Sequence, residues 1–540
     1  MRRFAELFHR LDSTTRTAEK VAALTDYFRE TPAEDAAAAV AVLLGHRTRR
    51  SVTTGELRAW AAEASGIPAW LVEECHAVVG DLAETIALLL PDATRVGEPI
   101  GLATLIAATV EPLTRLGPEE KRQAVLETWG RLRREERIVW HKLLTGGFRV
   151  GVARTLVARG LAEVAGVDAA TMSHRLMGMA SFTAETYRAL LAAEDPGESP
   201  TRPYPFFLAS PLEDDPASLG CRGAWIAEWK WDGMRAQLIR RGETRVLWTR
   251  GEELASDAFP EIVEAAESLP DGCVLDGEVL AAAGGRLLGF QAVSRRAGRR
   301  RVTPKLLAEI PCVFAIYDLL EYDHADIRGE PLEHRRRLLE GIGLPEFRVP
   351  AAVEGTLFLS PQVAGEDWEQ LAAARDGSRD LGVEGLMLKR RSSPYRVGRP
   401  RGDWWKWKVD PLEIDAVLLY AQAGHGRRAA LHTDYTLGVW HDGSLVPAAK
   451  AYSGLSDAEI AEVDRIIRRT TLQRHGPVRV VEPTLVFQLA FDAVAPSKRH
   501  KSGVAVRFPR IARWRRDKRP DEAGRLDDLR AMIAASEPDR

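Results

Sequence analysis

A single lysine enclosed by aromatic and charged residues is the most unusual chemical feature of the sequence. In the string EWKWDGMRAQ, Lys230 lies between Trp229 and Trp231 and directly before Asp232. If this string is a β-strand, successive side chains point to opposite faces. Glu228, Lys230 and Asp232 then share one face, and the tryptophans anchor the strand from the other. The pattern predicts charged groups that project together into a site.

Two roles are open to such a lysine. The commoner one is structural, as the partner of a carboxylate. A nucleophilic lysine must instead lose its proton, which neighbouring cations favour. The string WWKWKVD alternates in the same way, with Lys406 and Lys408 on one face and tryptophans on the other. If that strand lies beside the first, cations cluster around Lys230 and provide counter-charge for a polyphosphate.

Carboxylates complete the candidate site. CVLDGEVLA places Asp276 and Glu278 on one strand face, a natural pair for a divalent ion or a ribose hydroxyl. GVEGLMLKR adds Glu384 and Lys389. A nucleophilic lysine, several cations and two or three carboxylates together describe nucleotidyl transfer. In that chemistry the lysine attacks an α-phosphate, while a metal ion and the cations stabilise the leaving pyrophosphate.

The elements that must position these residues fall into distinct regions. Apolar residues three and four apart predict an all-helical domain over 1–190, and Pro, Ser and acidic residues mark a linker over 191–205. Short β-branched and aromatic runs with intervening helices predict an α+β domain with antiparallel sheets over 206–410. Five short strands and one helix within 411–540 fit a small closed β-barrel such as an OB-fold, followed by a helical tail.

A glycine-containing break interrupts the helical region. LLTGGFRVGV breaks the helical pattern at Thr145 to Gly147. Small residues there would let backbone N–H groups approach a phosphate closely. A plain turn between two helices explains the segment equally well.

Composition limits the class of protein. The chain has 540 residues, a net charge of −2, and 45% hydrophobic and 28% charged residues, as expected of a folded protein with three or four domains. The N-terminus lacks a signal-peptide pattern and no apolar run is long enough to span a bilayer, so we expect a cytoplasmic protein with no membrane partner. The four cysteines are too far apart for a CxxC zinc module.

Basic residues gather in local runs although the whole chain is nearly neutral. Ten Lys or Arg and one acidic residue lie between Lys498 and Arg519, and further basic runs cover 294–305 and 389–408. A single run of this kind is usually a solvated surface. Three runs with aromatic residues nearby favour surfaces built for phosphate groups.

Taken together, these strings resemble the ATP-dependent DNA ligases of the covalent nucleotidyltransferase superfamily. KWDGMR resembles the superfamily's KxDGxR motif, and its further motifs are matched in the family's order by TRGEE, LDGEV, AIYDLL, EGLMLKR, WWKWK and RFPRIARWRRDK. The helical region with LLTGGFRVGV also resembles the family's DNA-binding domain. The resemblance therefore covers essentially the whole chain.

The resemblance implies a role for each matching residue. Lys230 is the nucleophile that becomes AMP-lysine, and Asp232 belongs to the same catalytic motif. Asp517 and Lys518 are catalytic in self-adenylylation only, where they orient the pyrophosphate, so the C-terminal domain must swing between two conformations. Glu278 and Glu384 are the implied metal-binding residues. The implied ATP-contacting residues are Glu228, Arg235, Arg250, Glu278, Tyr317, Arg401, Lys406 and Lys408.

Individual contacts follow from the same resemblance. Glu228 contacts the adenine, and Arg235 and Arg250 hold the phosphate and ribose side. Tyr317 stacks on the base, where the family usually has Phe. Arg401 matches a further ATP-contacting arginine, although its spacing to the WWKWK motif differs from the family's by about a residue. Lys406 and Lys408 contact the α-phosphate. Glu278 contacts the ribose or the metal.

The implied enzyme uses ATP as substrate together with Mg²⁺, with Mn²⁺ as the alternative ion. It seals 5′-phosphate/3′-hydroxyl nicks in duplex DNA through lysyl-AMP and then DNA-adenylate, as a monomer that encircles the DNA. The scattered cysteines argue against an NAD⁺-dependent ligase, and a capping enzyme would not need the helical domain. An RNA ligase remains open, because no string specifies the sugar. A non-catalytic nucleic-acid-binding protein would have lost charged residues that are all present here.

Overall fold

The structure is a computed structural model that describes residues 1–46, 50–93, 100–148, 150–177, 179, 181–192, 200–299, 302–348, 355–424, 431–497 and 500–536. Its contacts divide the chain into two compact units. One comprises Met1–Val152 with Asp410–Arg540, and the other is Ala153–Val409. Residues 193–199 of the predicted linker, 300–301 of one basic run and 498–499 of another lie outside the described residues.

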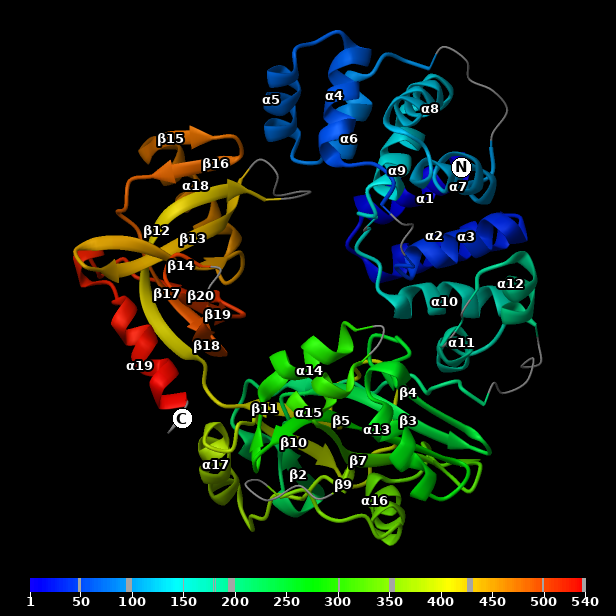
Figure 1. The fold of residues 1–540 in the computed structure, drawn as a ribbon, viewed down its shortest axis with the longest axis vertical. Helices are drawn as coiled ribbons and strands as arrows, with labels where there is room; N and C mark the ends of the chain where they lie inside the picture. Colours follow the sequence, from blue (N-terminus) through cyan, green and yellow to red (C-terminus); the bar gives the residue numbers. More distant parts are fainter. Residues whose placement is uncertain are drawn as a thin grey trace. The chain divides into compact units, whose positions relative to one another are not determined.

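The N-terminal region is helical, as predicted, and the described residues before 193 contain no strand (Figure 1). Nine of its helices belong to the first unit: α1 (Arg2–Ser13), α2 (Thr17–Glu30), α3 (Ala33–Leu43), α4 (Thr54–Ser65), α5 (Ala69–Val79), α6 (Leu82–Leu89), α7 (Leu102–Thr109), α8 (Pro118–Arg131) and α9 (Arg134–Leu144). The other helices of this region, α10 (Arg154–Ala165), α11 (Ala169–Leu176) and α12 (Ala184–Leu191), belong to the second unit. Helix α9 shows the pattern behind the prediction, because Val139, Trp140, Leu143 and Leu144 form one buried stripe.

The predicted break in the helical region is confirmed. Helix α9 ends at Leu144, and Gly146 follows with a φ of 64°. A left-handed residue just beyond the end of a helix stops its hydrogen-bond ladder, and glycine adopts this conformation without steric cost. The next helix, α10, begins at Arg154.

Two sheets form the framework of the second unit. One has the order β4-β3-β5-β7-β8, with β6 paired to β5 and β9 paired to β7. The other has the order β1-β11-β10-β2. The strands of the first sheet are β3 (Met234–Arg241), β4 (Thr244–Thr249), β5 (Cys273–Ala283), β6 (Arg286–Leu287), β7 (Cys312–Tyr322), β8 (Ala325–Asp326) and β9 (Leu357–Leu359). Those of the second are β1 (Ser210–Pro211), β2 (Trp225–Trp229), β10 (Gly385–Arg390) and β11 (Trp404–Lys408).

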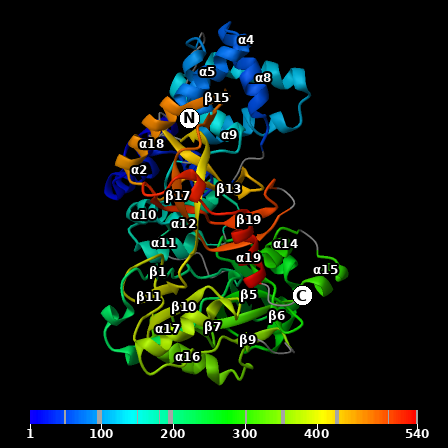
Figure 2. The ribbon, with the colours of Figure 1, turned by 90° about the vertical axis from the view of Figure 1, so that its left-hand side faces the viewer.

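Helices cover one face of the larger sheet. The helices of the α+β region are α13 (Pro260–Ala265), α14 (Gly289–Ala297), α15 (Pro304–Glu309), α16 (Leu332–Gly341) and α17 (Trp368–Asp376). Ile262, Val293 and Leu339 from α13, α14 and α16 pack with Leu275 and Phe314 of the sheet in one apolar core. Helix α17 lies against β10 of the smaller sheet (Figure 2). An α+β region with antiparallel sheets was predicted, and among its described strands β9 on β7 and β1 on β11 are the pairs that run in parallel.

The other face of the larger sheet packs against the smaller sheet. Ile239 and Val274 of the larger sheet share a core with Phe207, Trp404 and Tyr395. Side chains alternate between the two faces along a strand. The charged residues of β3 and β5 that lie on the same face as Ile239 and Val274 therefore also face the smaller sheet. The candidate site therefore lies between the two sheets.

The C-terminal region is a β domain with more strands than predicted. It contains nine strands and two helices among its described residues, where five strands and one helix before the tail were expected. The missed hairpin, β15 with β16, has the sequence TLQRHGPVRVV, whose polar and basic residues do not alternate clearly. The strands are β12 (Leu412–Ala423), β13 (His432–His441), β14 (Ser444–Ala451), β15 (Thr471–His475), β16 (Val478–Val481), β17 (Val486–Phe491), β18 (Ala493–Pro496), β19 (Val504–Arg507) and β20 (Arg510–Trp514).

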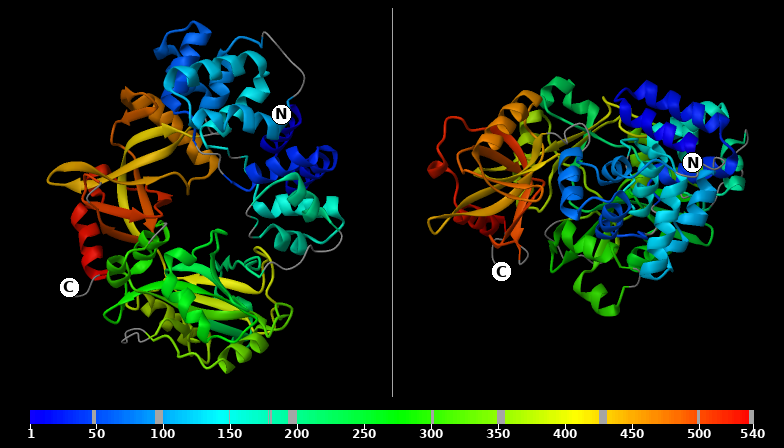
Figure 3. Two further views of the ribbon diagram at one scale, coloured as in Figure 1. Left: turned by 45° about the vertical axis from the view of Figure 1, so that its right-hand side comes forward. Right: turned by 90° about the horizontal axis from the view of Figure 1, so that it is seen from above.

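Helices α18 (Asp457–Thr470) and α19 (Leu526–Ser536) accompany these strands (Figure 3). The long strand β12 pairs with β17 through its first half, and along its second half it pairs with β13 and β16. Ile460, Val463 and Ile467 are the buried apolar residues of α18. The predicted helical tail is confirmed by α19. In the described part of the chain, no helix has the length and apolar character needed to cross a membrane.

Candidate active site

Lys230 lies directly after the last residue of β2 and is fixed by its backbone. Its N–H donates to the carbonyl of Gly385 at 2.8 Å, and its carbonyl accepts from the N–H of Glu384 at 2.8 Å. These bonds continue the antiparallel pairing of β2 with β10 by one residue. The nucleophile candidate is therefore held by a sheet ladder rather than by a loose loop.

The ammonium of Lys230 forms an ion pair with the carboxylate of Glu384. Lys408 Nζ lies 3.2 Å from the same carboxylate. Burial alone would raise the pKa of Glu384, but the charges and hydrogen bonds of Lys230 and Lys408 hold it below its ordinary value. Glu384 is therefore ionised at neutral pH. The predicted meeting of Lys230, Glu384 and Lys408 is observed.

The register of the smaller sheet explains how charged and aromatic residues are separated. Met387 of β10 faces Glu228 of β2 on one side and Lys406 of β11 on the other, so these three side chains form a row on one face. Leu386 likewise joins Trp229 and Trp407 in a row on the opposite face. The predicted division of these residues into a charged face and a tryptophan face is confirmed for β2 and β11.

Two details of that prediction are wrong. The strands β2 and β11 do not lie side by side, because β10 separates them. Trp231 also leaves the tryptophan face, since the strand has ended two residues earlier. It packs with Leu280, Phe347 and Phe358, and its indole N–H donates to Ser360 Oγ at 3.0 Å.

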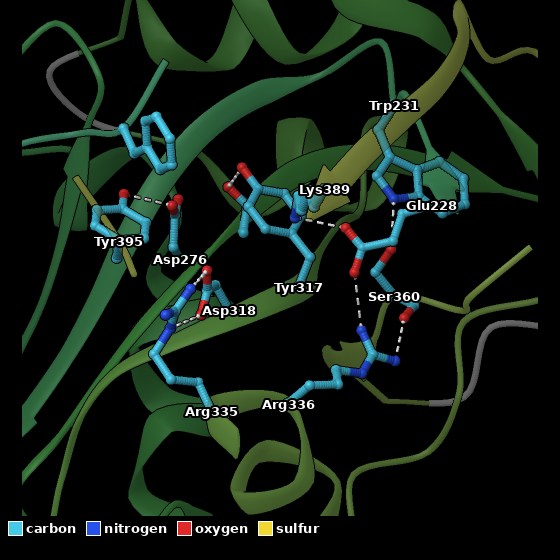
Figure 4. A network of polar contacts seen from close by, with 12 residues as sticks. Glu228, Trp231, Asp276, Tyr317, Asp318, Arg335, Arg336, Ser360, Lys389 and Tyr395 are labelled. Atoms are coloured by element: carbon cyan, nitrogen blue, oxygen red, sulfur yellow. Dashed lines mark hydrogen bonds and ion pairs between the residues drawn. The ribbon is translucent and has the colours of Figure 1, made fainter. Parts of the chain in front are cut away.

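Glu228 lies on the charged face but is sealed from solvent. Its two carboxylate oxygens contact Arg336 Nη1 at 3.1 Å and Lys389 Nζ at 2.5 Å (Figure 4). Arg336 also donates to the carbonyl of Ser360 at 2.8 Å, which ties helix α16 to the same network. Arg336 was not among the predicted site residues, and Lys389 was predicted only as a charged residue of the GVEGLMLKR string, without a specific role. Nothing in the local sequence of α16 distinguishes Arg336 from the arginines on either side of it.

The ring of Tyr317 lies beside this network. Lys389 Nζ is 4.2 Å from the ring centroid, a cation–π distance, and Arg235 Cζ is 5.8 Å from it. The hydroxyl donates to the carbonyl of Gly277 at 3.4 Å. Tyr317 therefore presents an aromatic face between two cations within the candidate site.

Asp276 and Glu278 share a face of β5, as predicted, but their surroundings differ. Asp276 is fully buried and accepts hydrogen bonds from Arg235 at 2.6 and 3.1 Å and from the Tyr395 hydroxyl at 2.7 Å. Both of its oxygens are thus engaged. The interpretation of the two residues as a ready pair for a divalent ion therefore fails for Asp276.

Glu278 differs from Glu384 in the direction of its pKa shift. Burial raises its pKa to about 8, with Asp276 acting in the same direction. Lys230, Arg235 and Arg250 oppose the rise. The charges of Lys230, Arg235 and Arg250 therefore act on Glu278.

Cations surround Lys406 on the neighbouring strand. Burial lowers its pKa, and the charges of Arg399, Lys230, Lys408 and Arg250 lower it further. The predicted cluster of cations is therefore present. Arg399 was not predicted, whereas the predicted Arg401 is an exposed residue that does not contribute to this shift.

The residues after Lys230 form a sharp bend. Asp232 is half-buried in it, and Gly233 begins the return to β3. A Cβ atom at Gly233 would lie 2.4 Å from the carbonyl oxygen of Val279 and 2.8 Å from Glu278 Cγ. Only glycine permits this close approach of the KWDG backbone to β5.

Asp517 and Lys518 belong to the C-terminal β domain. Lys518 Nζ contacts Asp415 at 2.6 Å, and Arg515 bridges Asp415 and Asp517 at 2.9 and 2.7 Å. A hydrogen bond from Arg515 is the main cause that holds the pKa of Asp517 well below its usual range. The two predicted residues are thus part of one charged network on this domain.

The second unit therefore contains a sheet-anchored lysine with an ionised carboxylate, a second titratable carboxylate, a cluster of cations and an aromatic ring. These are the groups that nucleotidyl transfer from a nucleoside triphosphate requires.

Models of known protein families match the same regions of the chain. The family model described as ATP dependent DNA ligase domain matches residues 207–408. The models for the DNA ligase N terminus and the ATP dependent DNA ligase C terminal region match 1–162 and 428–518.

Individual relatives extend over nearly the whole chain. A probable DNA ligase of Koribacter versatilis (strain Ellin345) is 30% identical, over 98% of this chain and 95% of its own length. A DNA ligase of Thermococcus fumicolans is 27% identical, over 99% and 98%. The solved structure Pmar-Lig_PreS3 is similar in fold, with a TM-score of 0.60 and 14% identity over 95% of this chain and 99% of its own. The chain belongs to the ATP-dependent DNA ligase family, whose general mechanism is nick sealing through an adenylate intermediate.

Proposed function

We propose that Lys230 is the residue that takes AMP from ATP, and that the AMP then passes to the 5′-phosphate of a nick in duplex DNA. The adjoining 3′-hydroxyl displaces the AMP and closes the strand. The observation that carries this proposal is the position of Lys230, which pairs with Glu384 among the cations of the smaller sheet. A purely structural lysine would not need Lys406, Lys408 and Arg250 nearby.

In the first step the Lys230 amine attacks the α-phosphorus, and the bond to the bridging oxygen of the pyrophosphate breaks. Glu384 holds the amine at the site before the reaction. Lys406 and Lys408 stabilise the negative charge that builds on the α-phosphate. Asp232, at the bend after the nucleophile, belongs to the same catalytic motif.

The nucleoside is assigned to the gap between the two sheets. Tyr317 stacks on adenine, while Arg235 and Arg250 lie toward the ribose and phosphates. Both oxygens of Glu228 are engaged by Arg336 and Lys389, so this residue forms the floor of the pocket and contacts adenine once Lys389 shifts. We keep Arg401 as a candidate for an ATP-contacting arginine. Arg399 is the stronger candidate for this contact, because its charge acts on Lys406.

The carboxylates of the site fit a divalent cation. Glu384 is ionised, and Glu278 lies close enough to feel the charge of Lys230. Mg²⁺ is commonly held by one or two carboxylates together with substrate phosphates, and Mn²⁺ accepts the same oxygen ligands. When bound, the cation neutralises charge on the leaving pyrophosphate. Glu278 and Glu384 are the residues that would hold it.

Residues outside the catalytic domain are assigned to DNA and to pyrophosphate. We assign 206–410 to nucleotidyl transfer, 1–190 to DNA binding, 191–205 to the linker and 411–540 to an OB-fold domain with its tail. The two flanking domains hold a nicked duplex, and the protein acts as a monomer that encircles it. Asp517 and Lys518 orient the pyrophosphate when the C-terminal domain closes over ATP.

Labelling with ATP tests the central assignment. The protein should acquire label from α-labelled ATP but not from γ-labelled ATP, through an acid-labile and alkali-stable P–N bond. Lys230→Ala should take up no label. Lys305→Ala is the matched control, because this lysine of the same domain is highly exposed and should label normally. Persistent labelling of Lys230→Ala would contradict the assignment.

A second assay tests the substrate class. The protein should seal a 5′-phosphate/3′-hydroxyl nick in duplex DNA, and its binding to that duplex should weaken steeply with salt, since phosphate contacts release counterions. Efficient joining of single-stranded RNA without DNA nick sealing would instead identify an RNA ligase, with the lysyl-AMP step unchanged.

A further inference from the structure

An ion pair joins the start of helix α10 to the turn that follows strand β4. The Nη2 atom of Arg154 contacts the carboxylate of Glu252, and the two side chains are 29% and 16% exposed. Both residues belong to the Ala153–Val409 unit. Arg154 is the first residue of α10, whereas Glu252 lies in the TRGEE string, two residues after Arg250.

The turn is closed by its own backbone. The N–H of Glu252 donates to the carbonyl of Thr249 at 2.9 Å, and the N–H of Thr249 donates to that of Glu253 at 2.9 Å. The N–H of Arg250 donates to the carbonyl of Arg235 on β3, also at 2.9 Å. The turn therefore fixes the backbone position of Arg250, from which its side chain extends.

Glu252 adopts a strained backbone conformation, with a φ of 61°. This left-handed region is unfavourable for residues other than glycine and persists where surrounding contacts enforce it. The contact with Arg154 is the side-chain interaction that can enforce it from outside the turn. Arg250, two residues earlier, acts electrostatically on Glu278 and Lys406 of the site.

The helix itself does not explain why an arginine, Arg154, stands at the start of α10. A cation at a helix N-terminus is opposed by the positive end of the helix dipole. Arg154 also donates to the carbonyl of Leu176 at 2.7 Å, which holds its guanidinium against the end of α11. The same Nη2 atom thus contacts both the carbonyl at the end of α11 and the carboxylate of Glu252.

We propose that Arg154 is a positioning residue for the nucleotide site. Through Glu252 it holds the turn at residues 249–253 in its left-handed conformation, and thereby sets Arg250 toward the phosphate and ribose side of ATP. The inference rests on the proposed function for the location of ATP, but it does not depend on Lys230 as the nucleophile. A segment outside the catalytic sheets therefore contributes to nucleotide affinity.

ATP affinity, measured by equilibrium binding in a Lys230→Ala background, tests the inference without any covalent step. Arg154→Ala should weaken ATP binding about tenfold, the scale of one lost hydrogen bond to a charged group. In the protein with Lys230 intact, the same change should raise KM for ATP in self-adenylylation and leave kcat within about twofold, as expected when uniform binding is lost. Arg159→Ala is the matched control, because Arg159 is an exposed residue of the same helix.

Glycine at position 252 separates positioning from a merely structural role. Glu252→Ala removes the ion pair and keeps the strain, so it should weaken ATP binding as Arg154→Ala does. Glu252→Gly removes the ion pair and the strain together, because glycine accepts a φ of 61° without penalty. It should therefore retain ATP affinity, and adding Arg154→Ala to it should cause no further loss.

The possible failures are distinguishable. Unchanged ATP affinity in Arg154→Ala, or equal losses in Glu252→Ala and Glu252→Gly, would overturn the positioning role. A thermal unfolding midpoint that falls without any change in ATP affinity would show a structural role only. Labelling of Lys230→Ala by α-labelled ATP would refute the proposed nucleophile and leave the binding comparison valid.

Discussion

Two lysine–carboxylate pairs lie close together on the smaller sheet, and they differ mainly in their access to solvent. In the sealed pair, Lys389 and Glu228 are 2% and 3% exposed, and Arg336 supplies a second cation. In the open pair, Lys230 and Glu384 are 20% and 18% exposed, and Lys408 supplies the second cation at 37%. The chemical groups are nearly the same in both.

The comparison shows that the surroundings of each pair, rather than its residue types, separate a structural role from a reactive one. In the sealed pair, helix α16 and the ring of Tyr317 close over the charges, so no substrate can reach them without displacing a side chain. The open pair lies where β2 has just ended, and its two side chains remain partly exposed. A buried pair specifies structure, whereas a partly exposed pair among cations can react.

The largest expected effect contrasts the same substitution in the two pairs. Glu228→Gln leaves the Lys389 ammonium buried without a carboxylate, so the free energy of unfolding should fall by about 3–5 kcal/mol. Glu384→Gln leaves cations that water can reach, and should cost roughly 1 kcal/mol. Urea unfolding of both variants measures the difference. Equal losses would show that the distinction between sealed and open pairs has no energetic basis.

A smaller effect is expected at a third pair, Lys518 with Asp415, on the C-terminal domain. Lys518→Ala should reduce self-adenylylation on the order of 10²-fold, the scale of losing one charge that stabilises a transition state. Folding should change little, because Arg515 still pairs with Asp415. Sealing of a nick that already carries AMP should persist, since no pyrophosphate leaves in that step. An equal loss in both assays would contradict the two-conformation mechanism.

The last expected effect concerns pH and contrasts two carboxylates of the open region. Burial raises the pKa of Glu278 from its ordinary 4.5 to about 8, so the folded state binds this proton more tightly than the unfolded chain does. The resulting stability is fully present below pH 4.5 and is lost as pH rises through 8, with a slope of up to ~1.4 kcal/mol per pH unit. Glu278→Gln should remove this loss.

Glu384 provides the control of opposite sign. Its pKa is lowered, so its contribution is present above its ordinary pKa and is lost as the solution becomes acidic. Glu384→Gln should therefore flatten the acid side of the stability curve and leave the decline above pH 4.5. Thermal unfolding of the two variants across pH 2 to 9 distinguishes the contribution of Glu384 from that of Glu278. A wild-type curve that rises between pH 5 and 8 would contradict the Glu278 assignment unless other groups are shown to cause the rise.

Local patterns predicted much of the site. Alternation in EWKW and WWKWK correctly separated Glu228 and Lys406 from Trp229 and Trp407, because a period of two is a property of each strand by itself. The order of helical, α+β and β regions followed from hydrophobic spacing. The ligase motifs identified the family from residues that lie in separate strands and turns.

Contacts between distant segments could not be predicted in this way. The insertion of β10 between β2 and β11 depends on the packing of the whole sheet. Arg336 and Tyr395 reach their carboxylates from a helix and a turn whose local sequences carry no signal for those partners. The choice between Arg399 and Arg401 likewise depends on the path of the chain before β11.

The ladder that fixes Lys230 also sets when the enzyme can first work during its synthesis. Lys230 and Glu384 are 154 positions apart, yet the N–H of Glu384 donates to the carbonyl of Lys230 and the two side chains form a salt bridge. A nascent chain on the ribosome that has not yet released β10 has the lysine but neither the ladder nor the carboxylate. Contacts of such long sequence separation form late and at high entropic cost. Incomplete chains therefore should not consume ATP, and the capacity for self-adenylylation should arise only as the catalytic domain completes its fold.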